Sequence, residues 1–558
     1  MKKFLLFAVL FSALVPLAQT LDPARKIASV EKIIETFYVD PVDTGKVVDE
    51  GIRAMLKKLD PHSSYTNAEE TKEVTEPLEG KFSGIGIQFQ MLNDTLYVIQ
   101  TIAGGPSERV GIQPGDRILV SNDSLISGVK RPNSSVMKLL RGPKGTVANL
   151  KVLRGKETID FRVVRDDIPI YSVDASYMVD PEIGYIRLSR FAEDTPKEMY
   201  EAIEKLNKQG MKKLIIDLQD NSGGYLQSAT TLAEMLLPFD APIVSTGSDR
   251  LGRSTYTAAA PSPLFDGPVQ ILVNQFSASA SEILSGAVQD NDRGIIVGRR
   301  TFGKGLVQRP FPFPDGSMVR LTVARYYTPS GRCIQKPYHD GDDDAYRDDL
   351  INRYKHGEYL SEDSIVLPDS LKYYTLKLHR PVYGGGGILP DKFVPIDTTG
   401  YSTYYRDLMA KGVYNRIVTN YIDANRKQLK KTYKNVGDFI SGFEISQKLI
   451  DEMVKLGEDE GVPYDEKGFE TSKETILTIL KGLIARDLFD QEAYWRVANR
   501  LDPVYLKAVE IFTTPGAYEA ALSLQIWKNY ADRFSIYLAH PAGRQIGPLY
   551  EQPPAQRY

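Results

Sequence analysis

This sequence of 558 residues has few cysteines and histidines, and its positive and negative charges nearly balance. With one cysteine, Cys333, the chain cannot form an internal disulfide, so its stability must come from packing in large cores. The five histidines are scattered along the chain, and none is close in sequence to the serine-rich segment at 277–281. The net charge of −3 lacks the basic excess of nucleic-acid-binding proteins, so we expect no DNA or RNA partner.

Long hydrophobic runs are also missing once the first 20 residues are passed. Those residues read MKKFLLFAVLFSALVPLAQT, with two lysines, an apolar run from Phe4 to Leu14 and a helix-ending Pro16. This pattern predicts a signal peptide over residues 1–20 and hence a protein exported to the periplasm or another extracytoplasmic space. A membrane anchor is the alternative, but the run is shorter than the ~20 apolar residues that a span needs. We therefore expect no stable membrane span after cleavage.

The length predicts two to four domains, and the first of them is a helical region at 21–74. Apolar residues recur there at helical spacing in two runs, which start at Ile27 and Val48 and are separated by Asp40-Pro41. Two amphipathic helices cannot form a stable fold alone. They must cover another domain or a second copy of the chain, and a homodimer through the helical regions is the hypothesis.

Residues 75–165 change to a strand pattern interrupted by AGGPSERVGIQPGD at 103–116. This small-residue turn, short helix and QPGD turn resemble those of a PDZ domain. The resemblance implies capture of protein or peptide C-terminal tails by strand addition, with backbone N–H groups of a glycine-bearing loop on the terminal carboxylate. SGIGI at 83–87 matches that loop, although a plain glycine-rich strand end would be spelled similarly. The expected peptide-binding residues are Gly84, Ile85 and Gly86, with Val136, Leu139 and Leu140 on the groove helix.

Residues 166–400 alternate apolar strand patterns with amphipathic helical ones, as in GYIRLSRF at 184–191 and KKLIIDL at 212–218. Repeated strand–helix–strand units predict an α/β layer with a largely buried sheet. Residues 401–558 are helical in pattern and predict a separate C-terminal helical domain. There Thr471 and Glu474 have the spacing of a capping box.

NQFSASASEI at 274–283 places three serines directly after the buried run VQILVN. Ser279 and Glu282 have capping-box spacing, so the serines explain a helix start without any chemistry. A helix N-terminus after a buried strand is also a favourable place for a nucleophile, since its N–H groups and dipole stabilise negative charge. From the residues alone, Ser277, Ser279 and Ser281 rank nearly equal as nucleophile, with a modest preference for Ser279.

A lysine supplies the missing base in RTFGKGLVQ at 300–308, where Lys304 lies between glycines and near Phe302, Leu306 and Val307. Desolvation in an apolar pocket lowers the pKa of a lysine, and the neutral amine can then accept a proton near neutral pH. A surface lysine in a turn is the plain alternative.

SASASEI followed by TFGKGLVQ resembles the C-terminal processing (tail-specific) serine peptidases, and the resemblance runs from LDPHSSY at 59–65 to GGGGILPD at 384–391. It implies a crotonase-like α/β core with an inserted PDZ domain and a catalytic Ser–Lys dyad. It assigns Ser279 as nucleophile, Lys304 as base and Gln308 as the residue that orients the lysine. DLQDNSGGYL at 217–226 resembles the family's oxyanion loop, except that Gln219 replaces arginine and Ser222 replaces proline. Gly223 and Ala280 are therefore the expected oxyanion-hole donors.

Three other interpretations fit the sequence less well. DNSGG at 220–224 resembles the nucleophile motif of trypsin-like proteases, but only His62 precedes it, ahead of the PDZ region. A catalytically silent PDZ scaffold or chaperone predicts a damaged dyad, and the sequence shows none. Acyl-CoA chemistry on a crotonase-like core lacks a coenzyme site. We expect an exported serine endopeptidase with no metal or cofactor, and we interpret the aspartates of 340–349 as a solvated loop, because they lack the glycine and final glutamate of a calcium loop.

Overall fold

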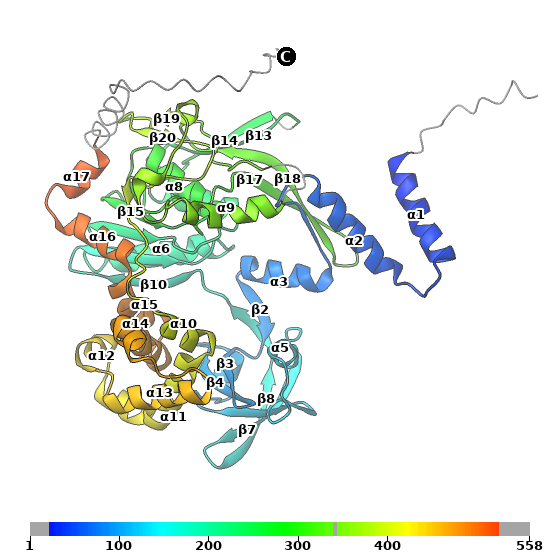
Figure 1. Ribbon diagram of the computed structural model, residues 1–558, viewed down its shortest axis with the longest axis vertical. Coiled ribbons are helices and arrows are strands. Elements are labelled where there is room, and N and C mark those ends of the chain that lie inside the picture. The colour runs from blue at the N-terminus through cyan, green and yellow to red at the C-terminus, as the bar shows by residue number, and fades with distance from the viewer. Residues whose placement is uncertain (1–21, 251, 339–342, 524–558) are drawn as a thin grey trace, which may run out of the picture. The chain divides into compact units, whose positions relative to one another are not determined.

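The computed structural model describes residues 22–250, 252–338 and 343–523, and the predicted signal peptide lies outside these ranges. The chain divides into two compact units. Figure 1 labels the helices and strands along the chain. The first takes in the chain up to Thr71, together with Gln308–Thr322 and Tyr338–Tyr346. The second holds Lys72–Val307, Val323–Pro337 and the chain from Arg347 onward.

The first unit begins with the two helices expected from the apolar spacing, α1 (Pro23–Phe37) and α2 (Thr44–Lys57). Strand β1 (Ser64–Thr66) then pairs antiparallel with the start of β18 (Met318–Tyr327). Asp60 holds the turn before β1, because its carboxylate accepts hydrogen bonds from the N–H groups of His62 at 2.8 Å and Ser63 at 2.9 Å. Three further elements run from one unit into the other: α3 (Ala68–Glu79), β17 (Leu306–Pro312) and α9 (Asp343–Lys355).

Within the second unit, the region expected to be a PDZ domain is an antiparallel sheet in the order β3-β4-β5-β7-β8, with β6 beside β5. Its core is apolar, and Leu96, Ile118, Val136 and Val152 are fully buried in it. A short pair, β2 with β9, closes the domain. The elements are β2 (Lys81–Gly84), β3 (Ile87–Leu92), β4 (Thr95–Thr101), α4 (Pro106–Arg109), β5 (Arg117–Ser121), β6 (Ser124–Leu125), α5 (Asn133–Leu140), β7 (Val147–Arg154), β8 (Glu157–Val164) and β9 (Asp166–Pro169).

The α/β layer is a six-stranded sheet in the order β10-β11-β12-β15-β16-β21. All neighbours run parallel except the antiparallel edge pair β10 and β11. Parallel strands need both faces covered, which is why β11, β12 and β15 are nearly continuous apolar runs. The elements are β10 (Val173–Met178), β11 (Ile183–Leu188), α6 (Thr195–Asn207), β12 (Lys213–Asp217), α7 (Leu226–Glu234), β15 (Val269–Val273), α8 (Ala280–Asp290), β16 (Ile295–Gly298) and β21 (Lys392–Phe393).

Two separate cores cover the two faces of this sheet. Helices α6, α7 and α8 pack on one face through residues such as Ile203, Leu232 and Leu284. The other face packs against α16 (Pro503–Thr513) and α17 (Ala517–Leu522), coloured orange to red in Figure 1, through residues such as Val504 and Phe512. The boundary expected at residue 400 therefore needs a correction. The last described helices complete the core of the sheet and are not part of a separate helical domain.

The remaining helices from residue 403 share a core of their own around Leu408, Val418, Phe439 and Ile476. They are α10 (Thr403–Ala410), α11 (Val413–Thr432), α12 (Val436–Gly442), α13 (Gln447–Asp459), α14 (Glu466–Leu488), α15 (Gln491–Ala498) and the 3₁₀ turn η3 (Asn499–Leu501). The capping box expected at Thr471 and Glu474 is wrong, since α14 begins earlier and Asp465 is its N-cap, accepting from the Gly468 N–H at 3.0 Å.

Smaller elements flank the sheet. β13 (Pro242–Ser248) pairs with β14 (Gly252–Thr257) and with the end of β18, and β19 (Lys372–Tyr374) forms a hairpin with β20 (Pro381–Tyr383). Two 3₁₀ turns, η1 (Glu362–Ser364) and η2 (Asp369–Leu371), precede that hairpin. Across the described ranges, none of the helices combines the length and the apolar content needed to cross a membrane.

Candidate active site

Ser279 stands where buried strand β15 turns into helix α8, and its backbone is strained. It is the N-cap of α8, with φ of 56° and ψ of −113°. Positive φ costs a residue with a Cβ roughly 1–3 kcal/mol, and such strain persists where the surrounding structure enforces it, often at functional sites. A strained serine at the start of a helix that follows a buried strand is also well placed for a nucleophile, since the N–H groups and dipole of the helix stabilise negative charge.

The three serines of the cluster occupy different environments. Ser277 is fully buried and its hydroxyl donates to the carbonyl of Leu218 at 2.7 Å. Ser281 is also fully buried, and its hydroxyl donates to the carbonyl of Asn221 at 2.8 Å. Ser279 alone is partly exposed. Ser279 stays the predicted nucleophile, because the hydroxyls of Ser277 and Ser281 donate to carbonyls of the neighbouring loop.

That neighbouring loop brings Gly223 directly against the serine. A Cβ on Gly223 would lie 2.7 Å from the carbonyl oxygen of Ala278, 2.8 Å from the Cβ of Ser279 and 2.9 Å from the Ala280 nitrogen. The backbone φ of Gly223 is 101°, which also favours glycine. The DLQDNSGGYL loop therefore lies in close contact with the start of α8, and its role as an oxyanion loop stays a prediction.

The two expected oxyanion donors differ in their present bonding. The Ala280 N–H has no acceptor among the described residues and lies at the open first turn of α8. The Gly223 N–H donates to the side-chain oxygen of Asn221 at 2.9 Å. Asn221 is itself fully buried and anchored to the Leu188 carbonyl at 2.8 Å. A substrate oxyanion would therefore have to share or replace the asparagine at Gly223, whereas Ala280 is available as it stands.

Lys304 lies on a loop whose main chain is fixed residue by residue. Thr301 donates its N–H to Ile388 O at 3.0 Å and Phe302 to Ser277 O at 3.0 Å. Gly303 and Lys304 both donate to the Glu282 carboxylate, at 2.7 and 2.9 Å. The Lys304 residue is partly buried and is followed by the buried Leu306. An apolar environment of the Lys304 amine and a lowered pKa both stay predictions.

Glu282 connects the serine and the lysine, and its importance was not apparent from the sequence. Its carboxylate is fully buried and accepts the Ser279 N–H at 2.8 Å as well as the two N–H groups of the lysine loop. The Thr301 hydroxyl donates to it at 2.5 Å. Burial raises the pKa of Glu282 to about 7, against hydrogen bonds from Thr301, Lys304, Gly303 and Ser279 that lower it. The capping-box spacing indicated its contact with Ser279 but not with the loop at 301–304.

Tyr326, near the end of β18, is a second such residue. It is 1% exposed, its hydroxyl lies within hydrogen-bonding distance of the Lys304 carbonyl, and it is 3.2 Å from the Ser279 carbonyl. Sequence reasoning did not identify this residue. Gln308, expected to orient the lysine, belongs to the other compact unit, where its amide nitrogen lies 3.4 Å from the Thr322 hydroxyl.

The expected peptide-binding residues of the PDZ region lie in two places, at the end of β2 with the loop after it and on helix α5. Gly84 ends β2, Ile85 is 2% exposed, and Gly86 has φ of 74° with Ile168 Cδ1 2.9 Å from where its Cβ would be. Val136 and Leu140 of α5 are buried in the core, so they hold the helix in place, whereas Leu139 is only partly buried.

Sequence reasoning missed the alternating apolar residues Ile87, Phe89 and Met91 of strand β3, which are partly buried against the same core as Leu139. Strand β3 forms one edge of its sheet. An edge strand has unpaired backbone groups that can receive an added strand. The alternation of β3 could have indicated these residues, because period-2 apolar patterning predicts a face that is buried or bound.

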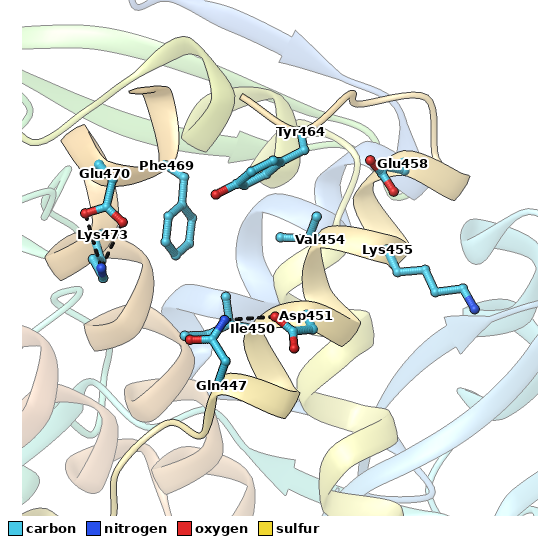
Figure 2. Close-up of a pocket in the computed structure, with 10 residues that line it drawn as sticks. All are labelled: Gln447, Ile450, Asp451, Val454, Lys455, Glu458, Tyr464, Phe469, Glu470 and Lys473. Carbon is cyan, nitrogen blue, oxygen red and sulfur yellow. Dashed lines mark hydrogen bonds and ion pairs between the residues drawn. The ribbon is translucent and has the colours of Figure 1, made fainter. Parts of the chain in front are cut away.

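Two cavities lie away from this constellation. One, of about 350 Å³, is lined by residues of α13 and α14 and of the connection between them, including Ile450, Tyr464 and Phe469 (Figure 2). Its rim is charged, and none of its lining residues is a serine or cysteine. The other, of about 740 Å³, is lined by Arg187, Arg299 and Trp495 among others, near the carboxyl ends of β11 and β16. Neither includes Ser279, Glu282 or Lys304.

Three family models match the chain. Residues 182–342 match peptidase family S41, and residues 83–164 match the PDZ domain. Residues 404–490 match a family of unknown function. Ser279 and Lys304 both fall within the peptidase match.

Curated relatives include a probable CtpA-like serine protease of Staphylococcus aureus, 36% identical over 313 residues that make up 56% of this chain and 62% of the relative. A protein of the same description from Staphylococcus epidermidis is 35% identical over 56% of this chain and 63% of its own length. The chain thus spans about 62% of the length of these relatives. A solved photosystem II D1 C-terminal processing protease is 28% identical, with a TM-score of 0.33 over 56% of this chain and 84% of that one. The chain therefore contains one region similar to peptidase family S41 and one similar to PDZ domains, and over 56% of its length it is similar to proteins described as probable CtpA-like serine proteases.

Proposed function

We propose that this protein is an exported serine endopeptidase that binds C-terminal tails of proteins on its PDZ domain and cleaves the tethered chain at Ser279. The observation that carries the proposal is the strained backbone of Ser279 between β15 and α8, packed against Gly223 and joined through Glu282 to the loop of Lys304. A helix start alone needs neither the strain nor the shared carboxylate.

In the proposed reaction, the neutral amine of Lys304 takes the proton of the Ser279 hydroxyl as the oxygen attacks the peptide carbonyl. The carbonyl oxygen becomes an oxyanion, which the N–H groups of Ala280 and Gly223 stabilise. The C–N bond then breaks, and Lys304 returns the proton to the leaving amine. Water hydrolyses the resulting ester by the same steps in reverse, with Lys304 again as base. Gln308 is assigned the orientation of Lys304 by family resemblance.

Substrate capture is assigned to the PDZ domain. The loop at 84–86 would hold the terminal carboxylate with backbone N–H groups, and the edge of β3 would pair with the tail. Its support is the edge position of β3 and the half-covered apolar side chains Phe89 and Leu139. A crotonase-like description of the α/β core, which the parallel sheet supports, is part of the same proposal.

Export to the periplasm or another extracytoplasmic space rests on the composition of residues 1–20. Homodimer formation rests on the first unit, where α1 has no buried residue and leaves Ile27, Val30, Ile33 and Phe37 each at least half exposed. An apolar helix face of this kind is stable in water only when another surface covers it.

The decisive experiment is mass spectrometry of the products formed from an unstructured test protein with a free C-terminal tail. We expect cleavage within the chain that is lost, by about 1000-fold or more, in Ser279→Ala and in Lys304→Arg, because a guanidinium stays protonated and cannot act as base. If Ser279→Ala cleaves as fast as the parent, the hydrolysis has another source and the catalytically silent scaffold is favoured. Lys304→Arg activity above a tenth of the parent's would count against the lysine.

A further inference from the structure

Two side chains link the main chain of Ser279 to the main chain of Lys304, one through their N–H groups and the other through their carbonyl groups. On the donor side, one oxygen of the Glu282 carboxylate accepts the N–H of Ser279 at 2.8 Å and the N–H of Lys304 at 2.9 Å. On the acceptor side, the Tyr326 hydroxyl reaches the carbonyl of Lys304 and lies 3.2 Å from the carbonyl of Ser279. Tyr326 is 22 positions from Lys304 and 47 positions from Ser279 along the chain, so this link is made by the fold.

The two linking side chains, those of Glu282 and Tyr326, are held in place by the residues packed around them. Glu282 is 0% exposed and lies on α8 within the core of the α/β layer. Tyr326 is 1% exposed, and its own N–H donates to Gly305 O at 2.9 Å, one residue beyond Lys304. A buried side chain surrounded by packed neighbours keeps its rotamer, so each link transmits the position of one loop to the other.

The hydrogen-bond geometry also requires a particular form of Glu282. Three of its partners are N–H groups, which can only donate. The fourth is the Thr301 hydroxyl, whose oxygen already accepts the Ile388 N–H at 2.7 Å and is therefore oriented to donate its proton. All four groups donate, so the ionised carboxylate satisfies every one of them. A protonated carboxyl group, or the side-chain amide of a glutamine at this position, would place a donor hydrogen of its own against one of these four donor groups.

We propose that Glu282 and Tyr326 are positioning residues that set the distance between the nucleophile Ser279 and the base Lys304. The inference rests on the proposed function, and it deepens that function by naming what aligns the dyad. Neither side chain is given a proton to transfer. Both act through the main chains of the two reacting residues, and a displacement of about 1 Å at such a site can lower the rate about 100-fold.

The test compares Glu282→Gln and Tyr326→Phe with matched controls elsewhere in the fold. Glu198→Gln is the control for the glutamate, since Glu198 lies in the first turn of α6 and accepts the N–H groups of Ser172 and Val173 at 2.8 and 2.9 Å. Tyr414→Phe is the control for the tyrosine, because Tyr414 is 3% exposed and donates to the Tyr405 carbonyl at 3.2 Å.

Three quantities are measured for each protein: kcat and KM on the test substrate, the melting temperature, and hydrogen exchange of the amides of Ser279 and Lys304. We expect Glu282→Gln to lower kcat about 100-fold and Tyr326→Phe about tenfold, with KM changed less than about twofold. Amide exchange at both residues should accelerate in Glu282→Gln. The controls should lose melting temperature without these changes in kcat or exchange.

The outcomes separate the two claims. If Glu282→Gln keeps the kcat of the parent, or loses kcat while exchange at Ser279 and Lys304 is unchanged, the positioning role is overturned. If the parent shows no hydrolysis that depends on Ser279, the proposed function fails. In that case the exchange measurement still decides whether Glu282 holds the two loops together.

Discussion

The loops around Ser279 and the peptide-binding edge of the PDZ domain are built in opposite ways. Around Ser279, consecutive N–H groups of residues 301–304 have acceptors, and the linking side chains Glu282 and Tyr326 are buried. At the PDZ domain, strand β3 is an edge strand, and Phe89 and Leu139 are only partly covered. The comparison teaches that this chain fixes the geometry of its proposed chemistry in advance and leaves its proposed recognition surface incomplete until a ligand adds a strand.

Of the changes that test this comparison, Gly223→Ala should have the largest effect, because it disturbs the fixed loops around Ser279. In Gly223→Ala, the new methyl group would lie within 3 Å of Ala278, Ser279 and Ala280, and the backbone φ of 101° is strained for alanine. We expect hydrolysis to fall at least about 100-fold, since the oxyanion donors and the serine must move apart. The measurement is kcat/KM on the test substrate together with the melting temperature.

Gly128→Ala is the matched control, because Gly128 has φ of 83° and nothing lies within 4 Å of the place that a methyl group would take there. It isolates the backbone strain of about 1–2 kcal/mol from the collision. Equal losses of activity in Gly128→Ala and Gly223→Ala would show that strain alone explains the result and that Gly223 has no special place at the site.

A smaller effect is expected at the recognition surface, where amidation removes the terminal carboxylate of a peptide tail. Hydrogen bonds from backbone N–H groups to a charged oxygen contribute roughly 1.5–3 kcal/mol, so affinity should fall about tenfold or more. Binding of free and amidated peptides to the Ser279→Ala protein, measured by calorimetry, tests this without turnover. Equal affinities would remove the role assigned to the loop at 84–86.

The smallest expected effect is a change in how steeply activity depends on pH. The pKa of Glu282 is raised to about 7 from 4.5, so between these values the folded protein holds a proton that the unfolded chain does not. Its contribution to the free energy of unfolding therefore increases as pH falls through this window. Activity should move the other way, because the protonated form cannot accept all four hydrogen bonds.

Lys336 is a charged group that interacts electrostatically with Glu282, and Lys304 donates its main-chain N–H to the same carboxylate. Because the proposed mechanism needs a deprotonated base as well as an ionised Glu282, the acid side of log kcat/KM should have a slope about one unit steeper in the parent than in Glu282→Gln. Equal slopes in the two proteins contradict the prediction.

Much of this arrangement was accessible from the sequence, and the physical reasons differ from part to part. Apolar runs and turns predicted β11, β12, β15 and α8, because a sheet covered on both faces needs continuous apolar strands. The glycines and apolar residues around Lys304 indicated it as a possible base, and the family resemblance then assigned it that role. The alternation of serine and alanine could not rank the three serines, since only the hydrogen bonds of Ser277 and Ser281 to residues 218 and 221 distinguish them.

What remained hidden depends on contacts between distant segments. Tyr326 reaches a serine 47 positions away, and the apolar faces of α16 and α17 pack on a sheet whose first strand begins at Val173. Helical periodicity shows that such a face is buried but does not identify its partner. For this reason the sequence predicted helices at the C-terminal end correctly and assigned the last of them to the wrong core.

The strained backbone of Ser279 also affects which residue types this position favours. Glycine, which has no hydroxyl, would adopt a φ of 56° without steric penalty, so it is the least strained residue for this turn. A lineage selected only for durability would drift toward that glycine. A serine at such a disfavoured turn is what the proposed chemistry predicts.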